Sequence, residues 1–318
     1  MSLLLRILAR SSCALVFVAA PASAAEQLIN VLTSSTSGVY YPLGIALSES
    51  IAKTMPGVKT LVSATKASAE NLNLLQAGRG EIAFTLGDSL SDAWKGNEEA
   101  GFKTPLQKLR GIAAIYPNYI QIVARADTGI KTLADLRGKK ISVGAPKLGI
   151  ERNARVIFAA AGIAYKDFAK VEYLPFGQSV ELMKDRQLDV TLQSAVLGAL
   201  ALHDVATSMD AVFVPIPADV IQKTNEPAYL PGTIPANTYR GQTADVPAVV
   251  VQNYLVTHEG VSNDTAYAMT KALWTGLERL VAAHPAAKAI DLKHALDGMP
   301  VPLHPGAEKY YREVRLIK

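Results

Sequence analysis

Cysteine is nearly absent from this sequence, since Cys13 is the single one among 318 residues. Cys13 falls in an N-terminal leader that we expect to be removed, so the mature chain would contain no cysteine. Such a chain needs neither disulfides nor thiol chemistry. It can therefore fold unaided in an oxidising compartment.

Signatures of metal, nucleotide and nucleic-acid binding are also lacking. No H-x-x-x-H or E-x-x-H pair, G-x-G-x-x-G loop or Gly-Lys-Ser/Thr phosphate loop occurs. The formal net charge is only +4, and no basic face is interleaved with aromatic residues. We therefore expect no metal ion, no cofactor and no nucleic-acid partner. The histidines are scattered along the chain: His203, His258, His284, His294 and His304.

Long apolar runs are missing beyond the first 24 residues. Residues 1–24 have the parts of a secretory signal peptide: Arg6 and Arg10 at the start, an apolar core over 13–20, and the small residues 22–24 (ASA). The core is too short to span a bilayer, which needs roughly 20 residues. Removing this signal peptide leaves 294 residues (318 − 24) with a formal charge of +2 (4 − 2). We expect an exported, soluble product.

The remaining chain alternates between strand and helix patterns, which predicts an α/β fold with mostly parallel sheets flanked by helices. Its size exceeds what one hydrophobic core usually serves, so two domains are expected. Helices are predicted over residues 42–53, 69–77, 150–161, 180–184 and 263–283. Strands are predicted over residues 28–33, 59–63, 81–86, 111–115, 119–125, 140–143, 171–174, 188–193, 211–214 and 248–257.

Two stretches have the character of crossings between domains. Residues 116–118 separate two apolar runs, and the polar residues 241–247 precede the apolar run 248–257. Two crossings predict a discontinuous domain 1, residues 25–116 plus 248–318, and an inserted domain 2, residues 117–247. A cleft between two hinge-linked domains is suited to closing on a ligand.

The loop over residues 33–41 is the first candidate for ligand binding. It begins with five consecutive hydroxyl residues, followed by Gly38 and, after Val39, by Tyr40 and Tyr41. A helix that starts near Pro42 directs unpaired N–H groups and its positive dipole end at this loop, so the loop is suited to an anion. An ordinary Ser/Thr-rich connection is the alternative.

Further loops follow other predicted strands and would face the same cleft. They are residues 64–68, 87–89, 144–149 and 193–194, and they offer hydroxyls, an amide, N–H groups and single charges. Lys147 is a cation placed before a predicted helix start, which would strengthen a carboxylate or phosphate site. A solvated loop lysine is the alternative reading.

An enzyme remains possible on one motif. Residues 84–92 (FTLGDSLSD) resemble the nucleophile block of GDSL-type esterases, with Ser89 as the nucleophile and Asp291 and His294 at the spacing of the family's Asp and His. The block follows the third predicted strand rather than the first, and the family's G-x-N-D block is absent. We therefore expect a protein that is not an enzyme.

Several motifs together resemble the TAXI-type solute-binding proteins of TRAP (tripartite ATP-independent periplasmic) transporters. They extend over almost the whole mature chain, and their order makes the resemblance specific. The motifs are residues 35–44 (STSGVYYPLG), 68–72 (SAENL), 142–146 (SVGAP), 151 with 153–155 (E, NAR), 233–236 (TIPA), 284–288 (HPAAK), 302–307 (PLHPGA) and 310–313 (YYRE).

The resemblance implies a monomeric, two-domain periplasmic receptor of the type II-like periplasmic-binding-protein fold. It would deliver a small anionic solute, an organic acid or an acidic amino acid such as glutamate, to TRAP membrane subunits driven by an ion gradient. A receptor for an ATP-driven importer is the alternative. Carried over by position, the ligand-binding residues would be Ser35, Thr36, Ser37, Tyr40, Thr65, Ser68, Asn71, Asp88, Lys147, Leu148, Gly149 and Gln193.

The sequence departs from the family at this site. Residues 35–39 (STSGV) replace a Gly-Thr-Gly-Gly-Thr run, and residues 147–150 (KLGI) replace Gly-Ser-Gly-Thr. Leu148 and Ile150 remove two hydroxyls, and Lys147 adds a charge. Because a changed pocket changes the choice of ligand, an anion is favoured but its identity does not follow.

Overall fold

The computed structural model describes residues 27–36, 38–144 and 149–318. The expected signal peptide and the expected site residues Ser37, Lys147 and Leu148 lie outside this part of the chain. Within it, no helix has both the length and the apolar character needed to cross a membrane.

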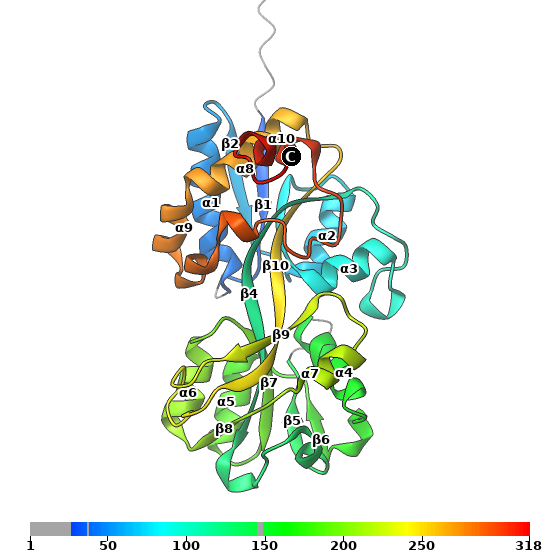
Figure 1. The fold of residues 1–318 in the computed structure, drawn as a ribbon, viewed down its shortest axis with the longest axis vertical. Coiled ribbons are helices and arrows are strands. Elements are labelled where there is room, and N and C mark those ends of the chain that lie inside the picture. The colour runs from blue at the N-terminus through cyan, green and yellow to red at the C-terminus, as the bar shows by residue number, and fades with distance from the viewer. Residues whose placement is uncertain (1–26, 37, 145–148) are drawn as a thin grey trace, which may run out of the picture.

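The described chain forms two lobes that share one ten-stranded sheet (Figure 1). The strand order is β2-β1-β3-β10-β4-β7-β5-β6, with β8 paired to β4 and β9 paired to β10. The strands are β1 (Leu28–Leu32), β2 (Lys59–Ser63), β3 (Ile82–Leu86), β4 (Leu109–Arg125), β5 (Lys140–Ser142), β6 (Lys170–Glu172), β7 (Val190–Ala195), β8 (Ala211–Val214), β9 (Tyr229–Ile234) and β10 (Val246–His258).

Helices cover both faces of the sheet in each lobe. In the upper lobe of Figure 1, α1 (Tyr40–Thr54), α8 (Asn263–Thr275), α9 (Leu277–Ala283) and α10 (Pro305–Glu313) pack on one face, and α2 (Ser68–Gln76) and α3 (Gly87–Lys95) pack on the other. In the lower lobe, α4 (Gly149–Ala160) and α7 (Ala218–Lys223) cover one face, and α5 (Phe176–Lys184) and α6 (Leu200–Ser208) cover the other.

The alternation of side chains along β1 explains the layers of the upper lobe. Ile29 and Val31 pack toward α1 and α8, whereas Leu32 packs toward α2 and α3. All three side chains are buried, as expected for a strand covered on both faces. Gly276 separates α8 from α9 where one long helix was predicted. A Cβ at this position would lie 2.2 Å from Ser50 Oγ of α1, so glycine permits the close approach.

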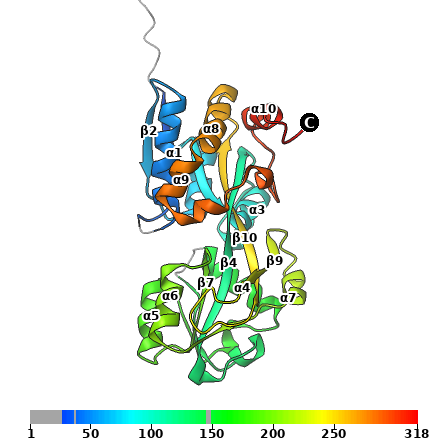
Figure 2. The ribbon, with the colours of Figure 1, turned by 60° about the vertical axis from the view of Figure 1, so that its left-hand side comes forward.

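The two lobes are joined by the long antiparallel strands β4 and β10, which run the length of the molecule in both views (Figures 1 and 2). Their register shifts between Gln252 and Tyr254, and this irregularity leaves Asn253 opposite residues 115–116. The Asn253 side chain donates to the Tyr116 carbonyl at 2.8 Å and accepts from the Tyr40 hydroxyl at 2.5 Å. One buried amide therefore connects the start of α1 with both connecting strands.

The expected α/β class and its two-lobed arrangement are confirmed, although the sheet is more mixed than the alternation predicted. Antiparallel pairings come from β4 and β10, because a strand that enters a second lobe and a strand that returns run in opposite directions. Ala248, Val249 and Val251 still pack in the lower lobe. We therefore propose residues 116–117 as the first domain boundary, as expected, and we propose to move the second from the expected 247–248 to residues 252–253 within β10.

Candidate functional site

The first candidate loop leads directly into α1. Ser35 and Thr36 are exposed, and the Ser35 carbonyl accepts the Gly38 N–H at 2.8 Å. Val39, at the N-cap of α1, provides no side-chain hydrogen bond to the first turn. Tyr40 turns inward instead, where its ring stacks on Phe84 with centroids 5.1 Å apart. Ser35 and Thr36 thus lie exposed beside the positive dipole end of α1, and Tyr40 anchors the loop.

Thr65, Ser68 and Asn71 brace the neighbouring strand ends. The Asn71 amide is fully buried, and its Nδ2 donates to the carbonyls of Thr33 and Phe84, each at 2.8 Å. Its Oδ1 accepts from the Thr65 hydroxyl at 2.7 Å. Ser68 Oγ accepts the Leu86 N–H at 3.1 Å. The polar atoms of these expected ligand residues therefore form hydrogen bonds that hold β1, β3 and α2 together.

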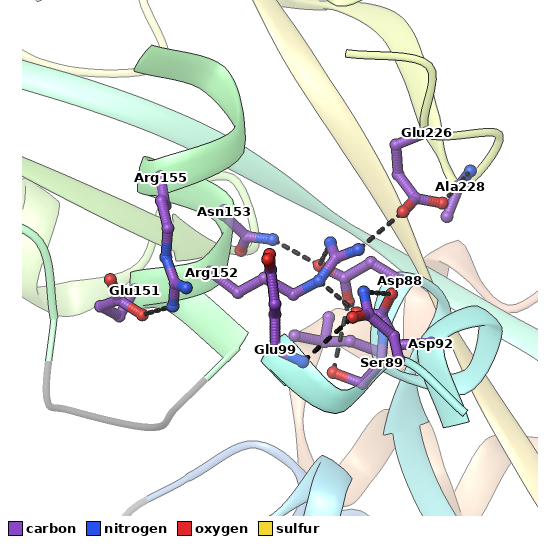
Figure 3. Close-up of polar contacts among 12 residues, drawn as sticks. Asp88, Ser89, Asp92, Glu99, Glu151, Arg152, Asn153, Arg155, Glu226 and Ala228 are labelled. Carbon is purple, nitrogen blue, oxygen red and sulfur yellow. Dashed lines mark hydrogen bonds and ion pairs between the residues drawn. The ribbon is translucent and has the colours of Figure 1, made fainter. Parts of the chain in front are cut away.

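Asp88 lies in the first turn of α3, a helix that the sequence analysis did not predict. Its Oδ1 accepts the Ser89 N–H at 2.6 Å. Its Oδ2 accepts from Arg152 at 3.2 Å and Asn153 at 2.5 Å (Figure 3), and from the Tyr229 hydroxyl at 3.2 Å, all three donors belonging to the lower lobe. The Asp88 side chain has no exposed surface. The structure thus directs this expected ligand residue at the other lobe.

Burial raises the pKa of Asp88 above the usual carboxyl range, against the opposite effect of the nearby Arg152 guanidinium. Glu226 and Asp92 add to the rise. The folded protein therefore holds this proton more tightly than the unfolded chain. The stability that the proton confers is complete below the ordinary carboxyl pKa and is lost as the pH rises through the raised value.

We expect the stability of the wild-type protein relative to Asp88→Asn to fall as the pH rises through this range. Urea unfolding of both proteins at steps between about pH 4 and pH 8 measures the difference. A difference that stays constant, or that grows in favour of the wild type with rising pH, contradicts the raised pKa.

The lower lobe contributes Gly149 and Gln193. Gly149 begins α4 against the upper lobe, where a Cβ would lie 2.9 Å from Leu86 Cδ1 and 3.6 Å from Ser89 Oγ. Gln193 is fully buried near the end of β7, and neither of its amide atoms has a hydrogen-bond partner among the described residues. Such an unpaired buried amide is costly, so its presence points to a ligand group or ordered water as its partner.

Thr191, in the first half of β7, was missed by the sequence analysis, whereas Ser194 belongs to the expected candidate stretch 193–194. Both hydroxyls are buried and lack a partner within the described chain. The end of β7 lies at the lobe interface, because Ala195 pairs with Tyr119 and Val196 packs against the core of the upper lobe. The signal was available in the sequence: β7 (VTLQSA) is a buried strand with an unusual share of polar side chains.

The esterase constellation is not assembled in the described structure. Ser89 Oγ lies 3.4 Å from Asp88 Oδ1, and the mainly exposed His294 side chain pairs with Asp297 at 2.7 Å rather than with Asp291. The Asp291 carboxylate accepts the Lys293 N–H instead. Across residues 27–36, 38–144 and 149–318, no group of three or more His, Cys, Asp or Glu side chains is placed to hold a metal ion.

The expected residues therefore fall into three sets. Tyr40, Thr65, Ser68 and Asn71 brace the upper lobe, Asp88 contacts the lower lobe, and Ser35, Thr36, Gly149 and Gln193 remain candidates for direct ligand contact. A surface hollow beside α5, lined by Leu174, Gly177, Gln178, Glu181 and Leu182, includes none of them.

Comparisons with known proteins agree with this architecture. The model of the NMT1-like family matches residues 31–314. PhnD1 from Prochlorococcus marinus, in complex with methylphosphonate, is similar over 92% of this chain and 100% of its own, with 11% identity and a TM-score of 0.57. XAC2383 from Xanthomonas citri, bound to ATP, is similar over 91% and 95%, with 13% identity and a TM-score of 0.56. The fold is that of two-domain periplasmic binding proteins.

Proposed function

The chain belongs to the NMT1-like family, and from this premise we propose that it is an exported, periplasmic solute receptor that binds a small anionic metabolite between its lobes. Binding would take place without chemical conversion. The receptor would act as a monomer and pass its ligand to a membrane transporter.

The observation that carries the proposal is the unpaired amide of Gln193. A fully buried side chain whose donor and acceptor groups have no partner in the described chain, on the same face of β7 as the buried Thr191 hydroxyl, has hydrogen-bonding capacity to offer a solute. Gln193 and Thr191 lie on one face of β7, because side chains two residues apart share a face. The opposite face, with Val190 and Leu192, packs into the core of the lower lobe.

The preference for an anion rests on the helix starts. The positive dipole ends of α1 and α4 lie near the lobe interface, where Gly149 of α4 packs against Leu86 and Ser89, and Ser35 and Thr36 are exposed beside the start of α1. Arg152 is held by carboxylates and is not free to bind the solute. We propose Ser35, Thr36, Ser37, Lys147, Leu148, Gly149 and Gln193 as ligand contacts. An organic acid or an acidic amino acid is the expected class, and phosphonates join it because PhnD1 was solved with methylphosphonate.

A thermal-unfolding screen of the mature protein tests this function. The panel contains dicarboxylates, keto acids, glutamate, glutamine, alkylphosphonates and alkylsulfonates. A ligand at a thousandfold its Kd stabilises the native state by about 4 kcal/mol, which raises the Tm by several degrees. We expect one chemical class to do so. A panel without shifts, together with hydrolysis of a short-chain ester that disappears in Ser89→Ala, would favour the esterase alternative.

The membrane partner is a separate proposal. The sequence resemblance favours TRAP subunits, whereas a phosphonate-transporter binding protein from Pseudomonas aeruginosa, described as an ABC component, has the same fold at 10% identity and a TM-score of 0.51. The fold alone does not distinguish the two kinds of transporter. We propose the TRAP partner on the strength of the sequence resemblance. Uptake by cells that carry the receptor and its membrane subunits should then persist after ATP depletion and stop when the ion gradient is collapsed. The opposite dependence would identify an ATP-driven importer.

A further inference from the structure

A charged cluster links the lobes outside the proposed ligand contacts. Arg152, in the first turns of α4, directs its guanidinium at carboxylates from both lobes (Figure 3). Its Nη1 lies 3.2 Å from Asp88 and its Nε contacts Asp92, both on α3 of the upper lobe. Its Nη2 lies 2.7 Å from Glu226, which precedes β9 in the lower lobe. One guanidinium therefore forms ion pairs with three carboxylates.

The cluster is largely shielded from water. The side chains of Asp88, Asp92 and Glu226 are 0%, 5% and 8% exposed, and that of Arg152 is 15% exposed. Separating the lobes would remove Arg152 from Asp88 and Asp92 but leave it with Glu226. The Tyr229 hydroxyl also stays with it, because Arg152 Nη1 donates to that oxygen at 3.1 Å. The lower lobe thus holds the guanidinium in place whether or not the upper lobe is docked.

Asp88 receives further contacts across the same interface. Asn153 and Tyr229 both donate to its Oδ2, and the Asn153 amide also bonds to the Tyr229 hydroxyl at 2.8 Å. The planar guanidinium and these two neighbours fix one relative orientation of α3 and α4, since each donor is directional. Charged hydrogen bonds in such a setting define geometry more than they add net stability.

We propose that Arg152 is a positioning residue that latches the two lobes together through Asp88 and Asp92. The latch rests on the described contacts alone and requires no ligand. It deepens the proposed function, because the closed arrangement sets the distance between the helix starts that would hold the solute. It also assigns Asp88 to lobe closure rather than to ligand contact.

Two matched substitutions test the latch. Asp92→Asn removes an ion pair that crosses between the lobes, whereas Glu226→Gln removes one within the lower lobe from the same guanidinium. Spin labels on cysteines at Asn73 of α2 and Glu181 of α5, both exposed, report the lobe separation. The mature chain has no other cysteine, so labelling is specific.

In the ligand-free protein we expect one short label distance for the parent and for Glu226→Gln. In Asp92→Asn we expect the ratio of closed to open molecules to fall about tenfold, with a second, longer distance. Near-ultraviolet circular dichroism shows whether each variant is folded. If Asp92→Asn fails to fold, Tyr229→Phe replaces it, with a smaller shift in the same direction.

An unchanged distance distribution in Asp92→Asn, or in its replacement, overturns the latch. The latch is also overturned if the parent protein, without any of these substitutions, already shows mainly the longer label distance. Because no solute is added, a failure of the proposed function leaves this measurement unaffected, and the two failures can be told apart.

Discussion

Replacing Gln193 with leucine should make the protein more stable and weaken its solute binding. The buried amide has no partner in the described chain, so an apolar side chain of similar size removes an unsatisfied group. We expect the free energy of unfolding to rise by about 1–2 kcal/mol. If the amide makes two hydrogen bonds to the solute, affinity should fall by about 10- to 100-fold.

The matched control is Gln121→Leu. Gln121 is the cross-strand partner of Gln193 and is equally buried, but its amide is satisfied. It accepts from the Tyr239 hydroxyl at 2.7 Å and donates to the Ala195 carbonyl at 3.2 Å. We therefore expect Gln121→Leu to lower the free energy of unfolding by about 1–3 kcal/mol. Urea unfolding measures both variants. A loss of stability in Gln193→Leu comparable to that in Gln121→Leu would show that Gln193 is satisfied within the protein.

Replacing Asn71 with leucine should destabilise the upper lobe by about 3 kcal/mol, because three hydrogen bonds are lost at about 1 kcal/mol each. The Phe84 carbonyl, the Thr33 carbonyl and the Thr65 hydroxyl all lose a partner at the base of the first candidate loop. For a chain of this size the Tm should fall by roughly 6–12 °C.

Asn73→Leu provides the comparison on the same helix. Asn73 is exposed, and among the described residues its side chain bonds to the Ala69 carbonyl alone, one turn earlier, so its replacement should change stability by about 0.5 kcal/mol or less. Scanning calorimetry of both variants separates the two sites. Equal, small effects would mean that Asn71 does not brace the strand ends.

The parts of the fold that were predictable are those with local signals. Apolar periodicity located α1, α2 and α4 within one or two residues, and Ser262 is the N-cap of α8, where its side chain accepts from Thr265. The helix α3 was missed because it starts directly at the end of β3, at Gly87, with no intervening loop. The continuous β4 was divided at Pro117, since proline normally ends a strand, yet Pro117 pairs with Gln252 beside the irregularity between β4 and β10.

The candidate site was predictable only in its location. Parallel sheets place ligand-binding side chains in the loops at their strand ends, so the sequence predicts a site there. The roles of Asp88 and Arg152 depend on contacts between distant positions: Asp88 lies 64 positions from Arg152 and 141 positions from Tyr229. No local pattern reports such contacts. The unpaired state of Gln193 is likewise a property of its three-dimensional surroundings, so it could be recognised only once those surroundings were known.

A crystal structure of the mature protein with the acid that stabilises it most would test the central claim directly. The account predicts one solute molecule between the lobes, with a polar group within hydrogen-bond distance of the Gln193 amide and its anionic end at the first turn of α1 or α4. A solute bound elsewhere, for example in the hollow beside α5, with Gln193 still unpaired, would contradict it.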